Sequence, residues 1–177
     1  NNNNHYYMYN PELFYELNTP VAETEFQVIK KAYELNSSDK RPAFNYAWVL
    51  IRSNNKDAQV QGVNLLTQIY KTIEAEKKKE ALFFLTLGNF KLKKYELSLK
   101  YIDSLINAED DLHNDTSSLR IVRDKIKEEI SRTAGTAFVG LTIGVGLLAA
   151  GLTVANKWYR TGCLLYTSDA ADELDGV

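Results

Sequence analysis

The chain has 177 residues, of which 45% are hydrophobic and 25% are charged, a balance typical of one folded domain rather than of a disordered chain. Its net charge of −2 comes from four acids after Arg160, because the first 160 residues hold 21 bases and 19 acids. The sequence has no basic stripe with interleaved aromatic residues, so nucleic acid is not expected as a partner. The single cysteine, Cys163, excludes a disulfide framework within the chain.

The N-terminal segment is of low complexity. It begins NNNNHYYMYN, and we expect residues 1–19 to form a disordered arm. Thr19 and Pro20 then resemble the N-cap and the first-turn proline of a helix, which NSSD (36–39) ends. Between these signals, apolar residues recur at steps of three and four, which predicts a helix with one buried face.

The same period continues in five further segments. Polar stretches separate them, among them SNNKD, a turn at Lys93–Lys94 and the loop NAEDDLHND. The pattern predicts helices over 41–53, 57–74, 77–91 and 95–107, with a sixth that Asp115 caps. Asp57 is the expected cap of the third. Six helices joined by short turns predict an all-α bundle over 20–133 in which neighbours run antiparallel.

Two of these helices resemble each other in sequence. FNYAWVLI (44–51) resembles FLTLGNFK (84–91) in having a small side chain amid aromatic residues, and matching Ala47 to Thr86 gives an offset of 39 residues. The helices that follow them repeat at 35 residues. Tetratricopeptide repeats have a period near 34, with small residues where the paired helices approach closely. We therefore predict two central tetratricopeptide-like repeats, with the first and sixth helices as caps.

A long apolar run follows the helical region. Residues 134–155, AGTAFVGLTIGVGLLAAGLTVA, contain no charge and would span about 33 Å as a helix, enough for a hydrocarbon core of about 30 Å. Trp158 and Tyr159 follow, where an interfacial aromatic belt belongs. The flanking bases are Arg132, Lys157 and Arg160. The run predicts a single membrane span.

The position of the span predicts a tail anchor. Insertion after synthesis would leave residues 1–133 in the cytosol, and weak hydrophobicity with a short basic tail (156–160) favours the mitochondrial or peroxisomal surface. The end of the chain, CLLYTSDAADE, resembles a translated sequencing adapter. We expect residues 161–177 to be such an artefact, the alternative being a genuine acidic tail.

Glycines line one face of the predicted span. Gly140 and Gly144 form a G-x-x-x-G pair, which favours close packing of membrane helices and a homo-oligomer. The alternative is that glycine is frequent in membrane spans without such a role.

Three segments resemble the mitochondrial fission 1 protein family: FNYAWVLIRS (44–53), GVNLLTQIY (62–70) and LFFLTLGNFKLKKYELSLKYIDSLI (82–106). The resemblance implies a six-helix cytosolic bundle with an outer-membrane anchor. It implies an adaptor on mitochondria and peroxisomes that recruits a dynamin-related GTPase, or the adaptors of that GTPase. Family members have an N-terminal arm that can lie over a concave groove, but the Asn- and Tyr-rich arm of this chain departs from their pattern.

The resemblance also implies that the first helix of each repeat lines the groove. Aromatic and aliphatic side chains ringed by charges suit an amphipathic partner helix. The expected groove residues are Arg41, Phe44, Trp48 and Ile51 on the first repeat, and Glu80, Phe83, Leu87, Phe90 and Lys91 on the second. Phe44, Trp48 and Phe83 could equally belong to the core, whereas Leu87 and Phe90 are the favoured groove positions.

Other functional classes fit less well. The two histidines, His5 and His113, belong to no catalytic set, and no metal-ligand spacing or phosphate-binding loop occurs, so neither an enzyme nor a cofactor or metal is expected. An alternative function is a tail-anchored chaperone-docking or import-receptor protein. That function needs a clamp of bases for carboxylates, and the groove offers only Arg41, Arg52 and Lys91. A third hypothesis assigns the function to the membrane helix itself, which would oligomerise through its glycine face and deform the bilayer.

Overall fold

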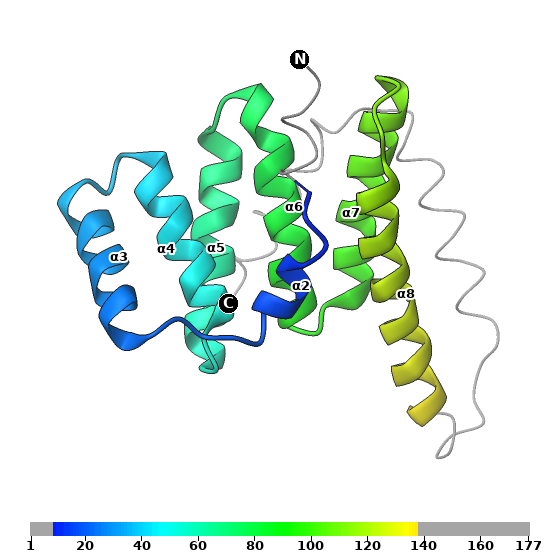
Figure 1. Ribbon diagram of the computed structural model, residues 1–177, viewed down its shortest axis with the longest axis horizontal. Helices are drawn as coiled ribbons and strands as arrows, with labels where there is room; N and C mark the ends of the chain where they lie inside the picture. Colours follow the sequence, from blue (N-terminus) through cyan, green and yellow to red (C-terminus); the bar gives the residue numbers. More distant parts are fainter. Residues whose placement is uncertain (1–8, 138–177) are drawn as a thin grey trace, which may run out of the picture. The chain divides into compact units, whose positions relative to one another are not determined.

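The structure is a computed structural model that describes residues 9–137 of the chain. Over this range all regular secondary structure is helical. The helices are α2 (Leu13–Glu16), α3 (Glu23–Leu35), α4 (Lys40–Arg52), α5 (Lys56–Thr72), α6 (Ala75–Lys91), α7 (Tyr95–Asp111) and α8 (Ser117–Ala137). Figure 1 shows α3 to α8 side by side in chain order, with successive helices antiparallel. The compact unit that they build ends at Ser131, within α8.

The all-α prediction is confirmed, and the six predicted helices correspond to α3–α8. The count is corrected to seven within the described residues, because α2 adds a short helix in the arm. The cap of α5 is also corrected. Asn55, not Asp57, precedes the first turn, and its Oδ1 accepts hydrogen bonds from the backbone of Asp57 at 2.8 Å and of Ala58 at 3.1 Å. Two donors that lack an intrahelical partner are thereby satisfied.

The prediction of a disordered arm is wrong for residues 9–19, which pack against the helical stack. Tyr9, Phe14 and Leu17 are buried there. Their spacing of five and three residues gives this polar segment one apolar side, and burying that side offsets the entropy lost on ordering. Residues 1–8 lie outside the described part of the chain.

Helix α4 has two buried faces. Phe44, Ala47 and Ile51 belong to the main core. Tyr46, Val49 and Leu50 belong to a second cluster, which the half-buried residues of α3 cover. Because successive residues of a helix are about 100° apart, the second set lies on the side of α4 that faces away from the first.

Small residues let the two helices of each repeat approach closely. In the first repeat, a Cβ atom added at Gly62 of α5 would lie 2.7 Å from the backbone oxygen of Ala47 on α4. In the second repeat, the Ser98 hydroxyl of α7 donates a hydrogen bond of 2.7 Å to the backbone oxygen of Thr86 on α6. Ala47 and Thr86 are the two positions matched by the sequence repeat, and both are fully buried, as the repeat predicts.

The predicted membrane span falls largely outside the described residues. Only residues 134–137 of 134–155 are described, and Gly140, Gly144 and residues 156–177 are not. Among the helices of residues 9–137, none combines the length and the apolar composition that crossing a bilayer requires.

Candidate functional site

The predicted groove-lining helices, α4 and α6, share a cluster of aromatic rings. Phe84 of α6 meets Phe44 and Trp48 of α4 edge to face, with ring centroids 4.9 and 4.8 Å apart. The same ring meets Phe83, its neighbour on α6, at 5.8 Å. Edge-to-face pairs add roughly 0.5–1.5 kcal/mol each beyond the burial of their area. They therefore hold α4 and α6, the first helices of the two repeats, at a fixed distance.

The N-terminal arm lies on this side of the stack, and Figure 1 shows α2 in front of α6. The Tyr9 ring lies 5.5 Å from the Phe83 ring, and the Phe14 ring meets Phe90 edge to face at 4.8 Å. We call the residues that contact the arm the arm-binding face. Its members are Arg52 of α4, Phe83, Phe90 and Lys91 of α6, Glu109 of α7 and Lys125 of α8.

Two bases of the arm-binding face bind carbonyl groups at the end of α2. Lys91 Nζ donates to the backbone oxygen of Leu17 at 2.6 Å and to Oδ1 of Asn18 at 3.0 Å. Arg52 Nε donates to the backbone oxygens of Glu16 at 3.2 Å and Thr19 at 2.9 Å. The last carbonyls of a helix lack intrahelical donors and carry partial negative charge. The face therefore recognises the C-terminal end of a helical turn.

Burial changes the acid–base properties of one of these two bases, since desolvation lowers the pKa of the Lys91 ammonium. The other base, Arg52, makes a further contact, because its Nη1 lies 3.6 Å from a carboxylate oxygen of Glu16. Both bases are thus engaged by the arm through more than one contact.

A buried carboxylate secures the other end of the arm. Glu109 is 1% exposed, and its oxygens accept from Lys79 Nζ and Asn114 Nδ2, each at 2.6 Å. The Tyr9 hydroxyl donates to the same carboxylate at 3.3 Å. Burial alone would raise the pKa of Glu109, but these hydrogen bonds and the Lys79 charge lower it below its ordinary value. Burial, followed by the charge of Glu109, raises the pKa of Tyr9.

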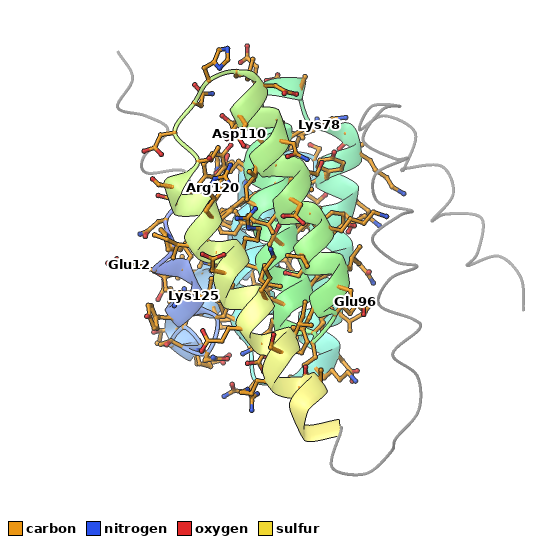
Figure 2. The ribbon with its side chains drawn as sticks, turned by 90° about the vertical axis from the view of Figure 1, so that its right-hand side faces the viewer. Glu12, Lys78, Glu96, Asp110, Arg120 and Lys125 are labelled. Atoms are coloured by element: carbon orange, nitrogen blue, oxygen red, sulfur yellow. The ribbon has the colours of Figure 1, made fainter. Side chains whose placement is uncertain are left out.

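The arm also touches α8. Lys125 Nζ lies 5.1 Å from the ring centroid of Tyr15, a cation–π contact. Figure 2 shows Lys125 on α8 on the same side of the molecule as Glu12 of the arm. The arm therefore contacts α4, α6 and α8, alternate helices of the stack, together with the end of α7.

The structure divides the predicted groove residues into three groups. Ile51, Phe83 and Leu87 are fully buried, and Phe44 is nearly so. Trp48, Phe90 and Lys91 are half-buried. At the rim, exposed Arg41 lies 3.4 Å from Oε1 of Glu80, with its guanidinium 5.5 Å from the centre of the Phe44 ring. Leu87, a favoured groove position, offers no surface while the arm is docked.

The arm itself was not predicted as part of the site. The signal that could have indicated it is the apolar pattern of Tyr9, Leu13, Phe14 and Leu17, which recurs at helical spacing inside a polar segment. Glu109 was also missed, because its burial depends on contacts with residues far away in sequence.

The chemistry of the site is that of binding. An apolar stripe is flanked by bases that donate to backbone carbonyls, which suits an amphipathic helical segment. No group of three or more potential metal ligands occurs among the residues that the structure describes.

Comparisons with known proteins agree with this architecture. Models described as the Fis1 N-terminal and Fis1 C-terminal tetratricopeptide repeats match residues 43–73 and 79–131. The chain is 34% identical to the mitochondrial fission 1 protein of Candida albicans over 139 residues, covering 76% of this chain and 88% of that protein. It is 35% identical to the protein of the same name from Tuber borchii, covering 79% and 87%.

Solved structures show the same fold. A crystal structure of yeast Fis1 in complex with an Mdv1 fragment matches with a TM-score of 0.62 and 25% identity, covering 68% of this chain and 94% of that one. Fis1 from Saccharomyces cerevisiae matches with a TM-score of 0.61 and 26% identity, covering 71% and 95%. The chain therefore belongs to the mitochondrial fission 1 protein family.

Proposed function

We propose that the chain is a non-enzymatic adaptor that recruits fission machinery to the outer mitochondrial membrane. The observation that carries the proposal is the arm-binding face, which holds a short amphipathic helix by aromatic contacts and by bases at its carbonyl end. A partner helix with the same features would bind by the same interactions, in place of the arm or beside it.

The partner class follows from relatives. Yeast Fis1, which shares the fold, has been crystallised with a fragment of Mdv1 that contains an N-terminal extension and a coiled-coil domain. We propose a fission adaptor of this kind, or a dynamin-related GTPase itself, as the partner. Its binding segment would carry aromatic or aliphatic side chains on one face of a helix, since Trp48 of α4 and Phe84 and Phe90 of α6 are half-buried rings.

The membrane attachment is part of the same proposal. The apolar run 134–155 would anchor the protein by a single span with the helical unit in the cytosol. The proposed location is the mitochondrial outer membrane, and the peroxisomal membrane is a second one. Gly140 and Gly144 would pack spans of neighbouring copies in a homo-oligomer.

The chaperone-docking alternative has less support. Within the described residues, each of the three bases that could form a carboxylate clamp already has a partner. Arg41 lies against Glu80, whereas Arg52 and Lys91 bind carbonyls of the arm.

The proposal is tested by removing two of the half-buried rings, Phe90 of the arm-binding face and Trp48 of the neighbouring aromatic cluster. In cells without another copy of the protein, the double variant Trp48→Ala/Phe90→Ala should recruit the fission partner at least tenfold less well. Its matched control is Ile121→Ala on α8, because Ile121 is an apolar side chain, 48% exposed, outside the arm-binding face. The control should recruit normally.

Both variants should melt cooperatively and reach mitochondria. Recruitment at the normal level by a folded, correctly located Trp48→Ala/Phe90→Ala protein would rule out the arm-binding face and the adjoining Trp48 as the partner site.

A further inference from the structure

A second site lies on the other side of α4. A pocket of about 430 Å³ is bounded by α3, α4 and α5. Its lining residues are Tyr33, Tyr46, Asp57, Val60, Gln61, Asn64, Leu65 and Gln68. Tyr46 belongs to the second cluster of α4, whereas Phe44 and Ile51 belong to the main core. The pocket therefore opens on the face of α4 that faces away from the arm-binding face.

The floor of the pocket is aromatic. The rings of Tyr33 and Tyr46 are stacked at 4.9 Å with an angle of 19° between their planes. Leu65 is half-buried beside them, and Val60 is 38% exposed. Such a surface accepts one apolar side chain of a ligand, because burying it removes apolar area from water at roughly 25 cal/mol per Å².

The wall of the pocket is a row of polar side chains on α5. Asp57, Gln61, Asn64 and Gln68 are all exposed. Among the described residues none of these four side chains has a hydrogen-bond or ion-pair partner. The pocket thus combines an apolar floor with polar groups along one wall that have no partner among the described residues, and ligand sites commonly combine these two features.

The spacing of the row indicates an extended peptide. At 1.5 Å per residue, the helix rises about 16.5 Å over the 11 steps from Asp57 to Gln68, with about 4.5–6 Å between successive polar side chains. An extended chain covers this length in about five residues, and its backbone groups on one side recur at about 6.6 Å. Carboxamides carry both a donor and an acceptor, so they match the free N–H and C=O groups of a strand. A helix has already used those groups on itself.

Charge defines one end of the ligand. Asp57 is the one carboxylate among the residues that line the pocket, and it forms no ion pair within residues 9–137. A Lys or Arg side chain in the ligand would complement it.

We propose that this pocket binds an extended, basic peptide segment of a partner protein. Its backbone would bond to Gln61, Asn64 and Gln68, with an apolar side chain on the tyrosine floor and a base at Asp57. The site is independent of the helix that the arm-binding face would bind.

The test uses the full chain in detergent micelles and a pool of randomised heptapeptides, acetylated and amidated at their ends. Selected peptides should carry Lys or Arg near one end and an aromatic or β-branched residue beyond it. Asn64→Ala/Gln68→Ala should weaken their binding at least tenfold, and Asp57→Asn should remove the preference for a base. The matched control is Asn107→Ala, which removes an exposed carboxamide of α7.

Two results would overturn the proposal: no enrichment over the starting pool, or binding that Asn64→Ala/Gln68→Ala leaves unchanged. Selected peptides with amphipathic helical spacing would also contradict it. The variant Trp48→Ala/Phe90→Ala should bind the selected peptides normally, so that failure here and failure of the adaptor proposal are distinguishable.

Discussion

Replacing Gly62 by alanine should destabilise the helical unit through a clash with backbone. The new methyl group would lie 2.7 Å from the Ala47 oxygen, and 2.9 Å from both Ile51 Cγ1 and Leu50 Cβ. Overpacking of this kind typically costs about 1–3 kcal/mol. A carbonyl oxygen cannot rotate away, so the cost should lie in the upper part of that range, offset by about 1 kcal/mol of helix propensity. The expected loss in the free energy of unfolding is about 1–2 kcal/mol.

Two other glycines provide graded controls. At Gly88 the new Cβ would meet only side-chain atoms, of which the nearest are a methyl group of Val63 at 2.9 Å and one of Ile51 at 3.1 Å, so Gly88→Ala should cost less than Gly62→Ala. Gly135 has nothing within 4 Å, so Gly135→Ala should leave stability unchanged or slightly raise it. Thermal melting followed by circular dichroism at 222 nm should place Gly62→Ala about 4–8 °C below the parent. A Gly62→Ala melting temperature equal to that of Gly135→Ala would refute the close-approach argument.

Three further predictions concern the arm and the helix ends. Phe14→Ala should remove the contact with Phe90 and release the arm, which faster hydrogen exchange and proteolysis of residues 9–19 would reveal; unchanged protection would contradict arm docking. Glu109→Gln should lose about 1–3 kcal/mol at pH 7, because Lys79 loses its partner. The pKa of Glu109 is lowered in the folded state, so the difference in unfolding free energy between the variant and the parent should be fully present above the ordinary glutamate pKa of about 4.3. That difference should shrink as the pH falls through the lower pKa of the folded state. Urea titrations at several pH values between 3 and 7 measure it, and a difference that does not change with pH would contradict the assignment. Lys93→Gly should stabilise the turn after α6 by about 1 kcal/mol, because Lys93 has a φ of 62°, and a lower melting temperature would speak against backbone strain there.

The helices were predictable because their signals are local. Apolar spacing marked α3–α8, and small residues such as Ala47 and Thr86 marked the repeat. The aromatic stripe of α6 was also visible, including Phe83 and Phe90. What the sequence could not indicate is which of these rings another segment covers. Phe83 is buried in a cluster that includes Tyr9, more than 70 positions earlier in the chain, and no periodic pattern encodes such a contact.

The α3–α5 pocket was unpredictable for a similar reason. In the sequence, the polar residues of α5 have the spacing of an ordinary solvent-exposed helix face, which does not predict a binding site. They become a wall only because Tyr33 of α3 stacks on Tyr46 of α4 and leaves space beside it. The cap at Asn55 was missed because Asp57, two residues later, is an equally good capping residue by type.

The two buried faces of α4 restrict how the protein can change over time. A surface helix can drift in sequence along its solvent side, but α4 has little such side between Ala43 and Ile51. A substitution that displaces its axis would disturb both the region under the arm and the tyrosine pocket. Variation that tunes one recognition surface without the other is therefore confined to the neighbouring helices, α6 for the first and α5 for the second.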